Sequence, residues 1–387
     1  MDDIDQLLRD TGRAFRESHP RAAEPVLRAR RPILLPLGAA AVTAALVVGV
    51  AVALPHQTAR HAPPVAATTT LTLAVKDVTD VALGRDYVAL STEPSGDLQV
   101  RRRADLQQVV LTLHTRFSRG ALDCPHLDGD WLAWVDDEIS SSNLVPGPPT
   151  RWSLELENLV TREHRTLLSG RPANAGPSTI PCPVGAGGRM AWNPDSVGAP
   201  ESVPSRVSVL DLSSGQVTTS RVAGEVIGVT DDGVILTRFH TPAGGHQLLS
   251  VVVHGAAGEQ TVTTVPRGTA AATDGRTLIT FADDPATPEA DGAFVRVCSL
   301  PGCRDVLVRA HDPLASWGVA GTTFVAWSDG DSATVRLLSG GRAMPVADGY
   351  VPFRTLAAFG DTLAYVTRPD YNNLGDKAPV ILHLQRY

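Results

Sequence analysis

The sequence predicts an all-β protein built as a seven-bladed β-propeller, preceded by one transmembrane helix and a short cytoplasmic amphipathic helix. Three observations support this fold class. Residues 32–55 form an apolar run without a charged side chain, later apolar runs are short and separated by Gly or Asp-Gly, and one turn-and-strand unit recurs seven times. The predicted segments are a cytoplasmic tail (1–31), a signal-anchor (32–55), a Pro/Ala/Thr linker (56–67) and an ectodomain (68–387).

The cytoplasmic tail is predicted to form an amphipathic helix over residues 2–18. Asp2 or Asp3 caps its first turn. Four apolar side chains recur at helical spacing on one face, namely Ile4, Leu7, Leu8 and Phe15. One interpretation is a solvated or membrane-surface helix without a partner. The other is a docking helix whose apolar face contacts a cytosolic regulator, with these four residues as the candidate contacts.

The apolar run PILLPLGAAAVTAALVVGVAVALP has the length and polarity of a transmembrane helix. It would extend about 36 Å as a helix, and the hydrocarbon core of a bilayer is about 30 Å thick. Arg28, Arg30 and Arg31 precede the run, whereas the first cation after it is Arg60. This bias predicts a cytoplasmic N-terminus and an extracytoplasmic C-terminal domain.

A buried core helix and a cleaved signal peptide are the alternatives to an uncleaved signal-anchor. The length of the run, its flanking arginines and the low-complexity linker argue against a core helix. The apolar region of a typical signal peptide is only about 7–15 residues long and is not preceded by so long a tail. We therefore expect the anchor to be retained in the cell membrane.

The ectodomain contains a repeated unit. Each copy is a turn followed by an apolar strand that often ends in an aromatic residue. Successive copies begin roughly 40–58 residues apart, the spacing of four-stranded propeller blades. The copies span residues 84–90, 129–134, 187–192, 232–237, 274–280, 321–327 and 360–365. Six blades, or a β-sandwich with extra strands, are the alternatives.

The remaining strands of a copy follow in a regular order. The third copy continues with VSVLDL (207–212), a Ser-Ser-Gly turn and QVTTSRV (216–222). Over residues 68–387 this order resembles the blades of WD40-like and TolB-like propellers, which have an inner strand, a Gly/Asp turn, a second strand and an outer hairpin. The seventh copy ends at VILHLQRY (380–387) without a fourth strand, and TTLTLAVK (69–76) is expected to supply it.

The four cysteines lie on the predicted outer side of the membrane, where disulfides persist. Cys298 and Cys303 flank a Leu-Pro-Gly turn and are predicted to pair across a tight hairpin. Cys124 and Cys182 each precede a proline and lie ten residues before the tryptophan that ends their unit. They are predicted to form a disulfide between neighbouring blades, with two free buried thiols as the alternative. No CxxC or second histidine at ligand spacing supports a metal site.

Linear catalytic motifs are absent from the sequence. It contains no GxSxG, HExxH, Walker A or GxGxxG pattern, and its histidines are scattered. Acidic clusters at 136–138, 283–291 and 329–331 are interpreted as solvated turns, with calcium binding as the alternative. No catalytic, cofactor-binding or metal-binding residue is assigned, and no cofactor is expected.

The connections between second and third strands are long in four copies. They cover residues 136–151, 193–206, 283–293 and 368–378 and are rich in Pro, Gly, Ser and Asp. Equivalent loops emerge on one face of a propeller, so this face is expected to bind the ligand, with neutral drift of exposed loops as the alternative. Beyond the tail, 27 Lys and Arg stand against 35 Asp and Glu, which argues against nucleic acid as a partner.

The LLRDTGRAFRE-like tail helix, the single anchor and the propeller-like ectodomain resemble actinobacterial single-pass membrane proteins. Some of these accompany extracytoplasmic-function sigma factors, although the tail lacks the His and paired cysteines of zinc-type anti-sigma factors. We expect a binding or sensing protein with an unidentified extracytoplasmic ligand or protein partner and a link to cytoplasmic regulation.

The alternative is a surface-anchored hydrolase or lyase with its site in the central funnel. Charged side chains that converge on the channel mouth from three or more blades would favour the enzyme. An apolar or loop-filled mouth would favour binding.

Overall fold

The computed structural model describes most of the chain from residue 66 onward. The described residues are 66–93, 95–117, 120–138, 151–170, 181–194, 206–231, 233–243, 245, 247–283, 293–300, 306–309, 317–329, 332–340, 343–346, 350–352, 354–369 and 377–387. The predicted tail and signal-anchor, and the docking residues Ile4, Leu7, Leu8 and Phe15, lie outside these ranges. Within them, no helix is long and apolar enough to cross a membrane.

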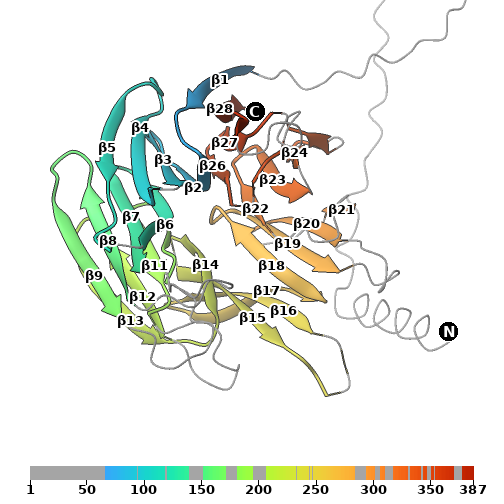
Figure 1. Cartoon of the computed structure of the whole chain (residues 1–387). Coiled ribbons are helices and arrows are strands. Elements are labelled where there is room, and N and C mark those ends of the chain that lie inside the picture. Colours follow the sequence, from blue (N-terminus) through green and yellow to red (C-terminus); the bar gives the residue numbers. More distant parts are fainter. Residues whose placement is uncertain are drawn as a thin grey trace, which may run out of the picture. The chain divides into compact units, whose positions relative to one another are not determined.

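Seven antiparallel sheets of four strands make up the described part of the chain (Figure 1). Blade 1 contains β2 (Asp77–Leu83), β3 (Tyr87–Glu93), β4 (Asp97–Arg102) and β5 (Val109–Leu113). Blade 2 contains β6 (Gly120–Asp128), β7 (Trp131–Glu138), β8 (Trp152–Asn158) and β9 (His164–Gly170). Blade 3 contains β10 (Val184–Ala186), β11 (Arg189–Trp192), β12 (Arg206–Asp211) and β13 (Val217–Arg221).

The other four blades repeat this order. Blade 4 contains β14 (Glu225–Thr230), β15 (Gly233–His240), β16 (Leu248–Gly255) and β17 (Gly258–Pro266). Blade 5 contains β18 (Gly268–Thr273), β19 (Thr277–Asp283), β20 (Ala293–Ser299) and β21 (Val306–Arg309). Blade 6 contains β22 (Gly318–Ala320), β23 (Phe324–Asp329), β24 (Ser332–Leu337) and β25 (Met344–Pro345). Blade 7 contains β26 (Leu356–Phe359), β27 (Thr362–Thr367), β28 (Val380–Arg386) and β1 (Ala66–Leu73).

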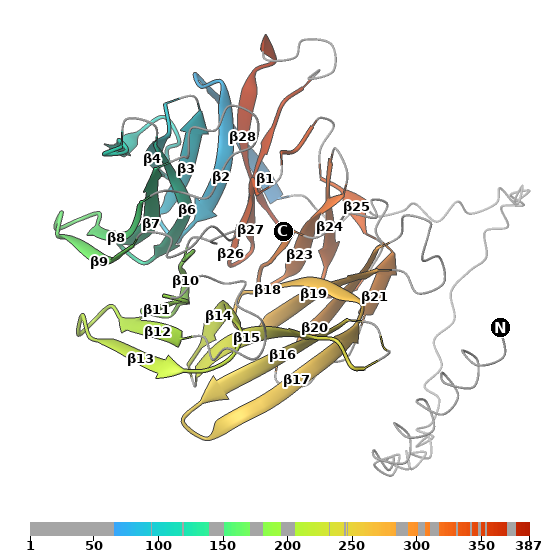
Figure 2. The same ribbon diagram turned by 60° about the horizontal axis from the view of Figure 1, so that its bottom comes forward.

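The innermost strands of the seven blades form a closed ring. β2 contacts β6, β6 contacts β10, and the series continues through β14, β18, β22 and β26 back to β2. Figure 2 shows the blades following one another around this ring in chain order. The predicted seven-bladed propeller is therefore confirmed, and the six-bladed and sandwich alternatives are wrong.

The N-terminal strand β1 closes the ring by completing blade 7. It pairs antiparallel with β28, with Leu71 opposite Leu382. Leu71 and Leu73 are buried in the seam between blades 7 and 1, whereas Thr70 and Thr72 are exposed. The predicted closing strand is confirmed with different bounds, because a bend over residues 74–76 ends β1 and leads the chain into β2.

The recurring sequence unit forms the hairpin between the first and second strands of every blade. The backbone N–H of Gly84 donates to the carbonyl of Tyr87, and that of Gly321 donates to Phe324. Gly129 and Gly360 have φ angles of 59° and 60°, which glycine adopts without a Cβ clash. The seven copies predicted from the sequence therefore mark the seven innermost hairpins.

The hydrophobic core is divided among the seams between blades. In β7, Leu132 and Trp134 pack toward blade 1, while Ala133 and Val135 pack toward blade 3 and Trp192. A strand that is buried on both faces needs apolar residues at successive positions rather than at alternate ones. This requirement explains the near-continuous apolar runs that end each repeated unit.

The acidic run 136–138 was predicted to be a solvated turn, and this prediction is wrong because it belongs to β7. Asp136 and Asp137 are 5% and 7% exposed. The Thr115 hydroxyl donates to Asp136 Oδ1 at 2.6 Å, and Arg116 Nε lies 3.2 Å from Asp136 Oδ2. These partners come from the preceding linker and stabilise a carboxylate within the strand. Asp329 is likewise buried in β23 and accepts a hydrogen bond from Thr334.

Candidate functional site

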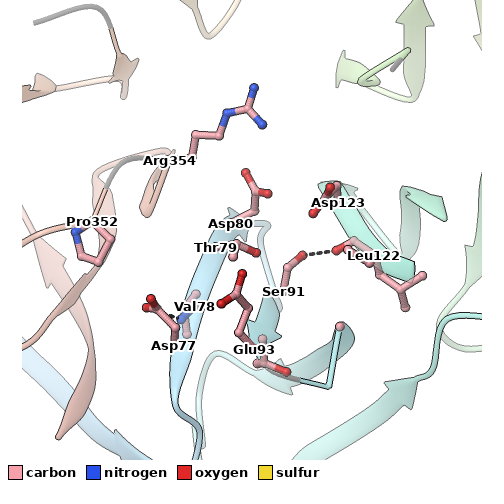
Figure 3. Close-up of a pocket in the computed structure, with 13 residues that line it drawn as sticks. Asp77, Val78, Thr79, Asp80, Ser91, Glu93, Leu122, Asp123, Pro352 and Arg354 are labelled. Atoms are coloured by element: carbon pink, nitrogen blue, oxygen red, sulfur yellow. Dashed lines mark hydrogen bonds between the residues drawn. The ribbon is translucent and has the colours of Figure 1, made fainter. Parts of the chain in front are cut away.

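A cavity of about 390 Å³ opens where the innermost strands of blades 1 and 2 begin (Figure 3). Its lining comes from β2 and β3 of blade 1, β6 of blade 2 and the segment before β26 of blade 7. Its charged lining residues are Asp77, Asp80, Glu93, Asp123 and Arg354. The connections between second and third strands emerge at the same end of the blades, although the long ones lie largely outside the described residues.

Two β-bulges bring carboxylates into this cavity. The pairing of β2 with β3 shifts register between Val78 and Asp80, and that of β6 with β7 shifts between Asp123 and His126. A bulge interrupts the alternation of side chains and changes the direction of the residues beside it. Asp80 and Asp123 therefore face the cavity from strands that otherwise pack in the core of the ring (Figure 3).

The disulfide between Cys124 and Cys182 adjoins the second bulge. Its Cα atoms are 5.3 Å apart, within the range of about 4.4–6.8 Å that disulfides adopt. Cys124 has a φ of 53°, which is uncommon for a residue other than glycine. The bond therefore joins blades 2 and 3, as predicted, and holds the backbone next to Asp123. Cys298 is also disulfide-bonded, and its predicted partner Cys303 lies outside the described residues.

Arg354 reaches the cavity from a tight turn in blade 7. Its φ is 65°, and the next residue, Thr355, donates its backbone N–H and its hydroxyl to the carbonyl of Pro352 at 3.3 and 2.6 Å. The guanidinium also lies 5.9 Å from the ring centre of Trp317, a cation–π distance. This turn places a fixed positive charge near Asp80 and Asp123 (Figure 3).

Burial controls the ionisation of the two aspartates. Asp80 is 8% exposed, and desolvation raises its pKa to about 7, with Arg354 opposing this shift and Asp123 adding to it. Desolvation also raises the pKa of Asp123, where Arg354 again opposes the shift and Glu93 adds to it. Two carboxylates of adjacent blades thus share one low-dielectric site, which disfavours ionisation of both.

Asp77 and Glu93 form a second acidic group in the cavity (Figure 3). Arg368, which is 3% exposed and follows β27, places Nη2 2.5 Å from Asp77 Oδ1. The same nitrogen donates to the carbonyl of Lys76 at 2.6 Å. Asp77 is therefore paired across the seam between blades 7 and 1, whereas Glu93 is exposed at the end of β3.

A second cavity, of about 470 Å³, lies on the outer strands of blade 2. Arg116 and Arg151 line it, 5.5 and 5.1 Å from the ring centre of Phe117. Both arginines already have carboxylate partners, Glu155 for Arg116 and Glu138 for Arg151. Because its charges are matched within the fold, this cavity is a weaker candidate than the one between blades 1, 2 and 7.

The cavity brings together charged side chains from three blades, namely Asp80, Asp123 and Arg354, which is the convergence that the sequence analysis associated with an enzyme. Sequence reasoning did not single out any of these residues. The available signal was an aspartate at an interior position of each of two inner strands, Asp80 and Asp123. In the described part of the chain, no group of three or more His, Cys, Asp or Glu is arranged to hold a metal ion.

Asp80→Asn is expected to stabilise the protein at pH 8. Burial raises the pKa of Asp80 from 3.8 to about 7 in the folded state. Below pH 4 Asp80 is protonated in both the folded and the unfolded state and costs no stability. As the pH rises to about 7 the unfolded state loses this proton more readily, so the free energy of unfolding falls. The shift corresponds to at most about 4 kcal/mol above pH 7, and asparagine removes this cost. Denaturant unfolding at pH 4.5 and pH 8 measures the effect, with the exposed Asp130→Asn as control. A variant no more stable than wild type at pH 8 contradicts the burial argument.

Comparisons with known proteins establish the fold. No protein-family model matches the chain, and no curated protein matches it. The β-propeller domain of the Trilobed protease from Pyrococcus furiosus is similar, with a TM-score of 0.52 and 7% identity over 76% of this chain and 91% of that one. That domain has an open velcro topology, whereas β1 completes blade 7 here.

Two other solved structures match with TM-scores below 0.5. Pyrococcus horikoshii acylaminoacyl peptidase matches with a TM-score of 0.49 and 9% identity, over 80% of this chain and 52% of that one. An oligogalacturonate lyase in complex with manganese matches with a TM-score of 0.37 and 12% identity, over 78% and 74% of the two chains. At such identities the likeness concerns the fold alone.

Proposed function

We propose that this chain is a membrane-anchored, extracytoplasmic propeller that binds a positively charged group of a small molecule in the cavity between blades 1, 2 and 7. The observation that carries the proposal is the charge of the lining. Asp77, Asp80, Glu93 and Asp123 contribute four carboxylates, against the guanidinium groups of Arg354 and Arg368. The cavity is therefore acidic, and Asp80 lies where burial opposes its charge.

A cationic ligand would relieve the cost of this arrangement. An ammonium or guanidinium group between Asp80 and Asp123 supplies the counter-charge and the N–H donors that a desolvated carboxylate needs. Carboxylates whose pKa is raised by burial in a concave site are candidates for functional positions, because active and binding sites use burial and neighbouring charges to shift pKa values. The cavity volume of about 390 Å³ falls in the range of small-molecule sites, about 300–1,000 Å³.

The extracytoplasmic, anchored location rests on three observations. The apolar run 32–55 is long enough to span a bilayer, arginines precede it, and the Cys124–Cys182 disulfide suits an oxidising compartment. Protease added to intact cells should digest the propeller and spare the tail; a propeller protected in intact cells would exclude this location.

The tail helix, with Ile4, Leu7, Leu8 and Phe15, is proposed to dock a cytosolic regulator.

The ligand proposal is tested by thermal shift and calorimetry with a panel of primary amines and the alcohols of equal length. Amines are expected to raise the melting temperature of the full-length protein, whereas the alcohols are not. Asp123→Asn should abolish the shift, because it removes one of the two carboxylates that face the cation. Asp130→Asn, on an exposed turn, should retain it. If alcohols bind as well as amines, or Asp123→Asn binds normally, the proposal fails.

Acid–base catalysis is a second candidate function, favoured by the convergence of Asp80, Asp123 and Arg354. Near neutral pH a protonated Asp80 can donate a proton to a leaving group. An ionised Asp123 can accept one from water in a hydrolase, or from carbon in a lyase. It ranks second because the described lining holds no histidine or cysteine, so the carboxylates would have to perform every proton transfer.

A panel of chromogenic glycosides and peptide amides tests the catalytic candidate. Turnover should fall above pH 7, as Asp80 loses its proton, and should be lost in Asp80→Asn. Activity that persists in Asp80→Asn, or no activity on any substrate of the panel, would argue against this candidate and leave the binding proposal in place.

A further inference from the structure

The second cavity, on the outer strands of blade 2, differs from the first in its lining. Its volume is about 470 Å³, and its described lining consists of two arginines, two aromatic residues, two residues with hydroxyl groups and Gly170. No carboxylate is among these described lining residues. β9 is the outermost strand of blade 2, so the cavity lies at the rim of the propeller (Figure 1).

Trp152 presents an aromatic ring to the second cavity. It begins β8 and pairs in register with Gly170 at the end of β9. A Cβ atom at position 170 would lie 2.6 Å from Cζ2 and 2.9 Å from Cε2 of the indole, so a glycine is needed for the ring to lie against β9. Trp152 is nevertheless partly exposed and lines the cavity. The indole is therefore supported by backbone and open to a ligand.

The two guanidinium groups of the lining are held in place by carboxylates. Arg151 donates from Nε and Nη2 to the two carboxylate oxygens of Glu138, both at 2.9 Å. Arg116 places Nε 3.2 Å from Asp136 Oδ2 and donates from Nη2 to Glu155 Oε1 at 2.5 Å. Within the described part of the chain these bonds use Nε and Nη2. The Nη1 group of each arginine therefore keeps its two N–H donors for a ligand.

The charges around the second cavity favour a neutral ligand over an ion. The carboxylates of Asp136, Glu138 and Glu155 already match the two arginines. An anion would gain little from guanidinium groups that are neutralised, and a cation would meet these groups first. The Thr166 hydroxyl donates to Glu155 Oε2 at 2.8 Å, so its oxygen remains an acceptor. The cavity thus offers fixed donors and an acceptor beside an aromatic ring.

We propose that the second cavity binds an uncharged saccharide. The face of an aromatic ring is electron-rich, so it attracts the C–H groups on one face of a pyranose. The hydroxyl groups of a sugar both donate and accept hydrogen bonds, and they suit the Nη1 donors and the Thr166 oxygen. Because the arginines are already fixed by their carboxylates, binding would cost little conformational entropy. This site is independent of the cation site, since the two cavities share no described lining residue.

Calorimetry and saturation-transfer NMR test the saccharide site on the full-length protein, in a detergent without a sugar headgroup. The probes are maltotriose, cellotriose, mannotriose and N-acetylchitotriose, with benzoate as an anionic aromatic compound. At least one trisaccharide is expected to bind, and benzoate is not. If none of the trisaccharides binds, or if benzoate binds and competes with the saccharide, the proposal is overturned.

Substitutions at Trp152 and Gly170 test whether the saccharide stacks on the indole. Trp152→Ala should weaken binding about tenfold or more, and Trp152→Phe, which keeps an aromatic ring, should retain most of the affinity. Gly170→Ala should also weaken binding, because its Cβ displaces the indole. Val160→Ala, 63% exposed in the turn after β8, is the control and should bind normally. Unchanged affinity in both Trp152→Ala and Gly170→Ala would overturn the proposal.

Arg151→Lys separates a binding role from a structural one. Lysine keeps the positive charge beside Glu138 but lacks the planar fork and its Nη1 donors. We therefore expect an unchanged melting temperature and a loss of saccharide affinity of about tenfold. Asp123→Asn, in the other cavity, should leave saccharide affinity unchanged. If Arg151→Lys binds the saccharide as tightly as the wild-type protein, the guanidinium does not contact the ligand and the proposed site is wrong.

Discussion

Replacing both Leu71 and Leu73 by alanine is expected to lower the free energy of unfolding by about 4–10 kcal/mol, at about 2–5 kcal/mol for each buried leucine. Leu71 and Leu73 are 6% and 5% exposed and fill the seam between blades 7 and 1 from the closing strand β1. Because β1 pairs with β28 alone, loss of its apolar contacts also weakens the closure of the ring. Denaturant unfolding at neutral pH measures the change.

Thr70→Ala with Thr72→Ala is the matched control for this experiment. Both threonines lie on β1 but are exposed, so their removal should change stability by less than about 1 kcal/mol. If the leucine variant is as stable as the threonine variant, the apolar face of β1 does not hold the ring closed.

Cys124→Ser combined with Cys182→Ser is expected to lower the free energy of unfolding by about 4 kcal/mol. The disulfide encloses a sequence separation of 58 residues, and the chain-entropy model assigns about this value to a loop of that length. The bond also fixes the backbone of Cys124, next to Asp123, so amine affinity should fall as well. Unfolding and calorimetry on the same variant measure the two effects.

Cys298→Ser combined with Cys303→Ser provides the comparison. The predicted Cys298–Cys303 disulfide closes a short loop and should contribute only about 2 kcal/mol in the same model. Cys298 lies in blade 5, away from the cavity. Amine affinity should therefore be unchanged. Equal losses of stability in the two double variants would contradict the dependence on loop length, and a loss of affinity in both would contradict the specific link between Cys124 and Asp123.

The fold could be predicted because its determinants are local and repeated. Each copy of the unit places a Gly or Asp turn before a strand that is buried on both faces, as in β7 with Trp134. The missing fourth strand of blade 7 and the spare strand after the linker then indicated how the ring closes. The pairing of Cys124 with Cys182 followed because both cysteines occupy the same place in adjacent copies.

The site could not be predicted because its residues are far apart in the sequence and depend on irregular backbone. Asp80 and Asp123 reach the cavity through bulges in β2 and β6. No residue pattern in those strands predicts a bulge. Arg354 belongs to the last blade and becomes a neighbour of Asp80 only when the ring closes. The acidic run in β7 was misassigned for a related reason, since Asp136 is stabilised by Thr115 and Arg116 from another segment.

The position of β1 in blade 7 has a consequence for biosynthesis. Residues 66–73 leave the ribosome before any other strand of the ring, yet their partner β28 (Val380–Arg386) is made last. Until β28 has been made, β1 lacks its partner strand, and an unpaired strand is prone to associate with other chains. The ring can therefore close only after β28 has been made, and contacts between such distant segments form slowly. The nascent chain is accordingly expected to need protection from aggregation until β28 has been made.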